Sequence, residues 1–186
     1  MNKSELRKMI VKSLEDLTPE YKESADAKIT ENILSMPEYE NAGTVFCFVG
    51  TEDEINTSPL IDKMLADNKK VCVPLCTDNG IMVAKHINSR ESLSKGKYGI
   101  MEPSESSATI APDDIDFAII PCVTCNKRGQ RLGHGGGYYD RYFENLDIPC
   151  ALICREETMT LAIPTGGHDL KFKTVVSERG IFRNEL

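Results

Sequence analysis

Apolar residues near the start of the chain recur at the spacing of an amphipathic helix. Within residues 4 to 17 they stand three or four positions apart, at Leu6, Ile10, Leu14 and Leu17. This period places their side chains on one helical face. The tripeptide Thr18-Pro19-Glu20 is typical of an N-cap followed by proline in the first helical turn. We therefore predict two consecutive helices.

Farther along, short apolar runs indicate buried strands. The segments TVFCFVG (44–50) and KVCVP (70–74) flank a helix predicted from Thr57 to about Asn68, which gives a β-α-β unit. The remaining predicted elements are the strands IMVAKHI (81–87), DFAIIP (116–121), CALIC (150–154) and TVVS (174–177), a loop over 104–114 and a short helix over 137–146. Apolar strands that alternate with helices predict an α/β fold, with a mostly parallel sheet covered by helices on both faces.

Length and charge limit the class of protein. The 186 residues fit one three-layer domain over 1–186, and the net charge is −7. No segment has the roughly 18 consecutive apolar residues of a membrane span. The charged start lacks the apolar centre of a secretory signal, and no basic patch with interleaved aromatic residues indicates nucleic acid. We expect a cytoplasmic monomer with no membrane or nucleic-acid partner.

The seven cysteines do not follow the pattern of a disulfide framework, because their number is odd and several lie inside apolar runs. Cys122 and Cys125 form a C-x-x-C with no second pair at the spacing of a zinc site. This favours buried or incidental thiols over a metal or redox site.

The segment RGQRLGHGGGYYDRYF (128–143) has the strongest chemical character in the chain. It follows the strand DFAIIP, so it lies at the carboxyl ends of the strands, where ligands collect in such sheets. Glycines let backbone N–H groups approach an anion, and the flanking Arg131 and Arg141 add positive charge. The segment matches neither a Walker A loop nor a Rossmann fingerprint. It predicts an anion site, with a tight turn that needs glycine for conformation alone as the alternative.

Together with other motifs, this segment identifies a family. RLGHGGGYYDR (131–141), after a strand that ends in Ile120-Pro121, strongly resembles the signature of the 5-formyltetrahydrofolate cyclo-ligase, or methenyltetrahydrofolate synthetase, family. Four further segments resemble its other motifs in the same order: KSELR (3–7), EINT (54–57), YGIMEP (98–103) and His168-Asp169 with the following TVVSERG (174–180).

The resemblance implies an activity. Members of this family use ATP and Mg²⁺ to close 5-formyltetrahydrofolate into 5,10-methenyltetrahydrofolate, with release of ADP and phosphate. Phosphorylation turns the formyl oxygen into a leaving group, and N10 of the folate attacks the carbon. The small-molecule partners expected here are therefore ATP and 5-formyltetrahydrofolate.

The resemblance also implies site residues. Arg131 and Tyr139 would be catalytic, and Asp140 and Asp169 would bind Mg²⁺. Val49, Glu54 and Tyr138 would contact the folate. The residues that would bind ATP are Lys3, Arg7, Arg131, Leu132, Gly133, His134, Gly135, Gly136, Gly137, Tyr138 and Tyr139.

On the residues alone, several of these assignments have a simpler alternative. Lys3 and Arg7 also fit a solvated helix face, and Tyr138 and Tyr139 also fit the core. In the same way, Asp140 fits a residue that complements a helix dipole. Asp169 fits a loop cap, Glu54 a solvated loop, and His134, at a variable position, an exposed side chain.

Asn126 departs from the family pattern, which commonly has an aspartate there. Asparagine keeps the size and the acceptor but loses the charge, so no metal or general-base role is assigned to it. Two other classes of function remain as alternatives. One is a different ATP-dependent phosphotransferase, and the other is a non-catalytic nucleotide- or folate-binding protein on the same fold.

Overall fold

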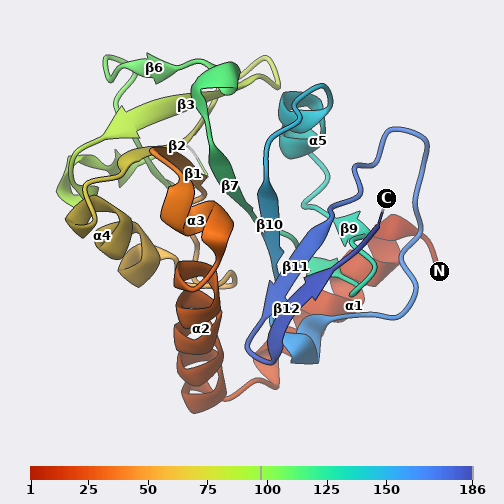
Figure 1. Cartoon of the computed structure of the whole chain (residues 1–186). Helices are drawn as coiled ribbons and strands as arrows, with labels where there is room; N and C mark the ends of the chain where they lie inside the picture. The colour runs from red at the N-terminus through yellow and green to blue at the C-terminus, as the bar shows by residue number, and fades with distance from the viewer. Residues whose placement is uncertain (97, 186) are drawn as a thin grey trace.

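A computed structural model of the chain describes residues 1–96 and 98–185; of the predicted domain 1–186, positions 97 and 186 lie outside the described residues. Figure 1 shows the course of the chain. The helices are α1 (Lys3–Glu15), α2 (Pro19–Leu34), α3 (Pro37–Asn41), α4 (Ser58–Ala66) and α5 (Tyr138–Phe143), with 3₁₀ turns at Arg90–Ser92, Pro112–Asp114 and Glu156–Thr158.

The strands form one large sheet in the order β12-β11-β10-β7-β1-β2-β3-β6 and two small hairpins, β4–β5 and β8–β9. The strands of the large sheet are β1 (Thr44–Cys47), β2 (Lys70–Cys76), β3 (Met82–Ile87), β6 (Thr109–Ile110), β7 (Phe117–Ile120), β10 (Cys150–Ile153), β11 (Thr174–Ser177) and β12 (Gly180–Arg183). The hairpin strands are β4 (Ser94–Lys95), β5 (Met101–Glu102), β8 (Thr124–Cys125) and β9 (Arg131–Leu132). The five central strands, from β11 to β2, run parallel. At one edge β12 pairs antiparallel with β11, and at the other β3 pairs antiparallel with both β2 and β6.

This architecture confirms the predicted α/β fold with helices on both faces of a mostly parallel sheet. The predicted strand 44–50 is too long, because β1 ends at Cys47. Beyond it, the Thr57 hydroxyl donates to the carbonyl of Phe48 and accepts from the N–H of Gly50, so the chain turns back there. The predicted loop 104–114 contains β6 and a 3₁₀ turn.

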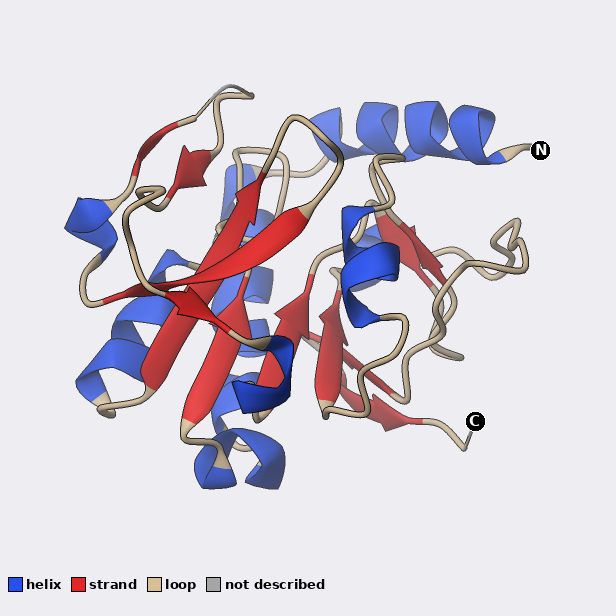
Figure 2. Cartoon of the chain, turned by 90° about the horizontal axis from the view of Figure 1, so that it is seen from above, coloured by secondary structure: helices blue, strands red, loops and turns tan. Residues whose placement is uncertain are grey.

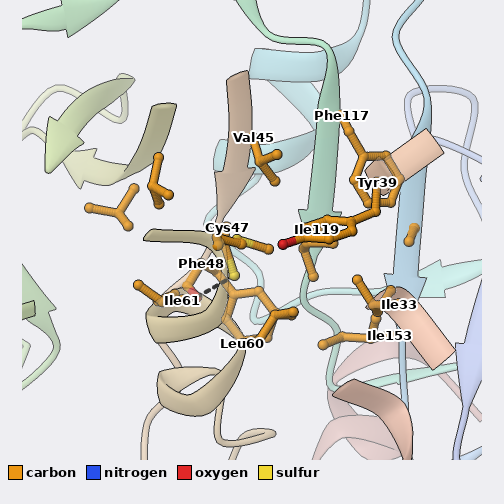
Figure 3. Packing of buried hydrophobic residues seen from close by; sticks show 14 of the residues in the cluster. Ile33, Tyr39, Val45, Cys47, Phe48, Leu60, Ile61, Phe117, Ile119 and Ile153 are labelled. Atoms are coloured by element: carbon orange, nitrogen blue, oxygen red, sulfur yellow. Dashed lines mark hydrogen bonds between the residues drawn. The ribbon is translucent and has the colours of Figure 1, made fainter. Parts of the chain in front are cut away.

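Alternate side chains of the central strands pack on opposite faces of the sheet. Val45 and Cys47 of β1 point to the face covered by α2, α3 and α4, where Figure 3 shows them with Ile61, Phe117 and Ile119. Phe46, between them, points to the other face, where it packs against α5. Figure 2 shows helices on both sides of the strands.

Helix α1 covers neither face. Its Leu6 and Ile10 pack with Leu132 of β9 and Ile163 in a separate cluster, at the end of the sheet toward which β7 and β10 run (Figure 1). A capping box between Asn2 and Glu5 begins this helix. The packing of α1 therefore brings the amino terminus to the segments that follow the strands.

The strand order reverses between β1 and β7. From β1 the chain crosses over to β2 on one side, and from β7 it proceeds to β10 and β11 on the other. In open α/β sheets, ligands bind outside the carboxyl ends of the strands at such a switch point. Among the described residues, no helix has the length and apolarity needed to cross a membrane.

Candidate active site

The segment between β7 and α5 first forms the hairpin β8–β9. Asn126 organises its turn and is 5% exposed. Its Oδ1 accepts from the N–H groups of Arg128 and Gln130, and its Nδ2 donates to Oε1 of Gln130 and to the carbonyl of Leu161. Because an aspartate cannot make the last two bonds, the asparagine at this position has a structural role.

The glycine loop, residues 133–137, leaves this hairpin. Gly135 and Gly137 have φ of +105° and +67°, in the left-handed region that favours glycine. Within the described part of the chain, the N–H groups of His134, Gly135 and Gly136 donate no hydrogen bond, and these residues are exposed. The loop therefore presents consecutive free donors, which is the property required of an anion cradle.

Arg131 lies beneath this loop and is 6% exposed. Its Nε donates to the carbonyl of Pro121 at 2.7 Å, and Nη1 lies 3.3 Å from Oδ2 of Asp140. The guanidinium also lies over the ring of Tyr139, 5.4 Å from its centroid. A buried cation held at two points is a fixed source of positive charge beside the loop.

Helix α1 reaches the same loop with two cationic side chains. Arg7 donates from Nε to the carbonyl of Gly133 at 2.7 Å. Lys3, one turn earlier, forms an ion pair with Asp169 in which Nζ lies 2.6 Å from Oδ1. Both side chains therefore have partners at the site, unlike residues of a plain solvated helix face.

The two predicted metal ligands lie on adjoining segments. Oδ1 of Asp140 accepts from the N–H of Leu170 at 3.3 Å, which places the backbone next to Asp169 against it. Burial acts to raise the pKa of Asp169, but the ion pair with Lys3 and the hydrogen bond from the Gly166 N–H outweigh it, so the pKa lies below the ordinary value. Asp169 is thus ionised near neutral pH.

Glu54 approaches the glycine loop from the segment after β1. Its Oε1 lies 3.0 Å from Nε2 of His134, and its Oε2 accepts from the N–H of Thr51. Burial acts to raise the pKa of Glu54, but the hydrogen bonds from His134 and Thr51 lower it overall. His134 is exposed, as expected, and it contacts a carboxylate.

A buried ion pair that the sequence did not reveal supports the Glu54 segment. Arg155 donates from Nε to Asp26 at 2.7 Å and from Nη2 to the carbonyl of Glu54 at 3.0 Å. Asp26 also accepts from the N–H of Asn56. The paired residues stand 129 positions apart, so no local pattern could have indicated them.

The aromatic residues differ in their surroundings. Tyr139 packs against Phe46 and Phe143, and burial raises its pKa well above the ordinary value, so its hydroxyl stays protonated. The Tyr138 side chain instead reaches the segment after β2, where its hydroxyl is 3.4 Å from the carbonyl of Thr77.

Arg141, considered above as an anion ligand, donates to the carbonyls of Gly80 and Gly136.

A cavity of 130 Å³ lies at the switch point, between the ends of β1, β7 and β10 and the helix α1. Its lining includes Glu54 and His134, and the remaining residues are Val11, Leu14, Phe48, Asp53, Ile55, Pro121, Cys122, Val123, Ile153, Cys154, Arg155 and Thr158. Val49 and Tyr138 do not line it. Val49 is 9% exposed and packs in the core with α4.

Most of the predicted site residues therefore fall into one group. Lys3, Arg7, Glu54, Asp140 and Asp169 converge on the glycine loop and Arg131. Outside this group, Val49 packs in the core, and the Tyr138 side chain reaches toward Thr77.

Comparisons with known proteins agree with the motifs. The model of the 5-formyltetrahydrofolate cyclo-ligase family matches residues 1–178. A probable 5-formyltetrahydrofolate cyclo-ligase of Schizosaccharomyces pombe is 29% identical, over 99% of this chain and 98% of its own length. The Escherichia coli K12 cyclo-ligase is 30% identical over 69% of this chain and 72% of its own. The structure of Aquifex aeolicus 5,10-methenyltetrahydrofolate synthetase has a TM-score of 0.86 at 27% identity, and the match covers 98% of this chain and 93% of that chain.

Proposed function

Since this chain belongs to the 5-formyltetrahydrofolate cyclo-ligase family and is a ligase, we propose that it converts 5-formyltetrahydrofolate to 5,10-methenyltetrahydrofolate with ATP and Mg²⁺. The products of ATP are ADP and phosphate. We place the protein in the cytosol, because its seven free thiols suit a reducing compartment. We also propose that it acts as a monomer.

The observation that carries this proposal is the convergence of two distant segments, together with the neighbouring Arg131, on one glycine loop. Arg7 of α1 holds the carbonyl of Gly133 at 2.7 Å, and Glu54, from the segment after β1, contacts His134 at 3.0 Å. Arg131 lies beneath the same loop. The arrangement places an anion cradle next to a cavity at the switch point, where ligands bind in such sheets.

The donor groups fit ATP and Mg²⁺. The free N–H groups of residues 134–136 and the cations Lys3, Arg7 and Arg131 suit triphosphate oxygens. Asp140 and Asp169 are half-buried carboxylates, and Mg²⁺ prefers one or two of these with phosphate oxygens and water. When bound, ATP would supply the phosphoryl group that turns the formyl oxygen into a leaving group, and Mg²⁺ would neutralise charge on the phosphate oxygens. The ammonium group of Lys3, which pairs with Asp169 in this structure, would then bind a phosphate oxygen instead.

The chain's own residues would orient the two substrates and stabilise the charge on the phosphoryl group. Arg131, fixed by Pro121, places positive charge where phosphoryl oxygens would lie, and such charge-stabilising groups typically contribute most to phosphoryl transfer. The protonated Tyr139 hydroxyl is suited to donate a hydrogen bond rather than to act as a base. Glu54, ionised at the cavity, is suited to accept hydrogen bonds from the pterin. Val49 and Tyr138 remain proposed folate contacts at the margins.

The test is the ATP-dependent growth of the near-ultraviolet band of the methenyl product. Purified protein would be mixed with 5-formyltetrahydrofolate, ATP and Mg²⁺, with parallel omission of ATP and with chelation of Mg²⁺. The proposal requires growth only in the complete mixture. Nucleotide or folate binding without any band would favour the non-catalytic alternative.

A pair of arginine variants tests the site within the same assay. Arg131→Lys keeps the charge but loses the planar group that holds Pro121 and Asp140, so turnover should fall at least about 100-fold. The exposed Arg128 lies three residues away, and Arg128→Lys should match the wild type. Equal turnover of the two variants would exclude Arg131 from the machinery.

A further inference from the structure

Three cysteine side chains converge on one point beside the cavity. The sulfur atoms of Cys122, Cys125 and Cys154 all lie within 4.8 Å of one another. Among the described residues, this is the one group of three or more His, Cys, Asp or Glu side chains placed to hold a metal ion.

The fold brings the three residues together from separate segments. Cys122 follows β7, Cys125 ends β8, and Cys154 comes immediately after β10. Since β7 and β10 are parallel neighbours, residues after their carboxyl ends lie side by side. The C-x-x-C pair of Cys122 and Cys125 is by itself a weak metal motif. The third cysteine of the cluster, Cys154, lies 29 residues after Cys125, so the spacing in the sequence did not indicate that it joins them.

The distances suit a thiophilic ion. Zn–S bonds are about 2.3 Å, so tetrahedral thiolates around Zn²⁺ lie roughly 3.8 Å apart. Sulfur atoms already within 4.8 Å need to close by about 1 Å or less. Cys122 is half-buried, and Cys125 and Cys154 are buried, so the side chains enter the site with their positions largely fixed.

A fourth ligand position is also available. The hydroxyl of Thr158 lies 3.4 Å from the sulfur of Cys154, and Cys122, Cys154 and Thr158 all line the 130 Å³ cavity. Zinc is almost always four-coordinate, and some zinc sites combine three protein ligands with a water molecule in the fourth position. Three thiolates with Thr158 or a water as the fourth ligand would satisfy this coordination number.

We propose that Cys122, Cys125 and Cys154 form a second metal site, specific for a soft or borderline divalent ion such as Zn²⁺ and distinct from the Mg²⁺ site. Thiolates select such ions over Mg²⁺, which prefers hard oxygen ligands. Each thiol that binds releases its proton to solvent, and no oxidant or reductant is involved. The site goes beyond the proposed ligase function and does not depend on it.

Co²⁺ is the probe, because cobalt–thiolate bonds absorb in the near ultraviolet and tetrahedral Co²⁺ absorbs in the visible. The 186-residue chain, reduced and freed of metal, would be titrated with Co²⁺ in excess Mg²⁺. We expect both bands to saturate at one ion per chain and to disappear when Zn²⁺ is added.

Cysteine variants identify the ligands. Loss of a supporting partner around a metal ligand alone costs about 10–100-fold in affinity, so Cys122→Ser, which loses a ligand directly, should weaken Co²⁺ binding at least about 100-fold. Cys150→Ser is the matched control, because Cys150 is also half-buried and its sulfur also lies 3.4 Å from a backbone carbonyl. Cys154→Ser should behave like Cys122→Ser; if its burial prevents folding, Cys122→Ala provides the second measurement.

Three outcomes would overturn the site. They are the absence of thiolate bands in the wild type, full binding by Cys122→Ser, and equal loss in Cys150→Ser. If the protein showed no thiolate bands and mild oxidation removed two thiols per chain, the cluster would be a redox-active cysteine pair and not a metal site.

Discussion

At the scale of single residues, Asp140 is the carboxylate that pairs with the buried Arg131 beside the glycine loop. Its two oxygens accept from Arg131 and from the N–H of Leu170, and its side chain is 27% exposed. Asp140→Asn keeps an acceptor for Leu170 but removes the charge proposed to bind Mg²⁺. We expect turnover to fall at least about 100-fold, with a loss of stability of about 1 kcal/mol.

Steady-state rates over a range of Mg²⁺ concentrations and urea denaturation measure the two effects of this substitution. Asp147→Asn, at an exposed position after the same helix, is the control and should leave both unchanged. If Asp140→Asn lost stability in proportion to its activity, Asp140 would be a structural residue and not a metal ligand.

Asn126 gives the opposite expectation, a change in stability first. Asn126→Asp restores the residue common in the family but places a carboxylate against Oε1 of Gln130 and the carbonyl of Leu161. Because two acceptors would then face a buried charge, we expect a loss of about 2–4 kcal/mol in the free energy of unfolding. Urea denaturation measures it, with the exposed Asn88→Asp as the control. An unchanged midpoint would show that the hairpin does not depend on the amide.

Glu54 predicts a pH dependence of stability. Its pKa in the folded protein is lowered, by hydrogen bonds that outweigh burial, so its contribution is fully present above the unfolded value of about 4.5. It is lost as the pH falls through the folded value. The wild type should therefore lose stability relative to Glu54→Gln as the pH falls below about 4.5, by about 1 kcal/mol in total. Urea denaturation from pH 7 to 3 tests the sign, and a difference that is constant with pH would contradict it.

Motifs indicated much of the candidate site at this scale, because family signatures point to individual residues without a structure. They identified Arg131, Asp140 and Glu54, which the fold places around one loop. They could not reveal Arg155, whose partners Asp26 and Glu54 lie more than 100 residues away. The cluster of Cys122, Cys125 and Cys154 was missed for the same reason.

At the scale of elements, α1 links the amino terminus to the glycine loop. It is fixed by Leu6 and Ile10 against Leu132, which leaves Arg7 directed at the carbonyl of Gly133. Arg7→Ala should raise KM for ATP about tenfold or more while thermal stability changes little, since Arg7 is half-buried and the apolar contacts of the helix remain.

Lys8→Ala provides the comparison for Arg7→Ala, because Lys8 is an exposed cation of the same helix. Substrate-saturation curves for ATP on both variants separate a local effect from a general loss of positive charge. A similar rise in KM for the two would show that α1 acts only through its charge.

The predictability of the elements follows their burial. The central strands and long helices were predicted, because β7 and β10 are continuous apolar runs and α1 has a clear period. The short strands β6, β8 and β9 were not, because two residues carry no period and pairing alone defines them. β1 was predicted too long, since its exit depends on contacts of Thr57 ten residues after its last residue.

At the scale of the whole molecule, the site includes residues from Lys3 to Asp169, so its geometry depends on contacts that cross the fold. The contact that supports Glu54 most directly is the ion pair of Arg155 with Asp26, because Arg155 also donates to the carbonyl of Glu54. It ties α2 to the segments after β10 and after β1. The position of the Glu54 segment at the cavity therefore depends on an ion pair between distant elements, and one member of the pair, Arg155, also lines the cavity.

Two Arg–Asp pairs of the same type allow this dependence to be tested. Arg155 and Asp26 are 4% and 8% exposed, whereas Arg90 and Asp62 form a pair of similar geometry at the surface, with Asp62 52% exposed. Asp26→Ala leaves a buried guanidinium without its counter-charge and should cost about 3–5 kcal/mol. Asp62→Ala should cost less than about 1 kcal/mol. Urea denaturation at low temperature measures both.

The folded fraction of Asp26→Ala should also show a raised KM for the folate, because the Glu54 segment has lost the Asn56 contact. Equal costs for the two substitutions would mean that the buried pair is replaced by water or by local rearrangement, and that the position of Glu54 is set by its own loop.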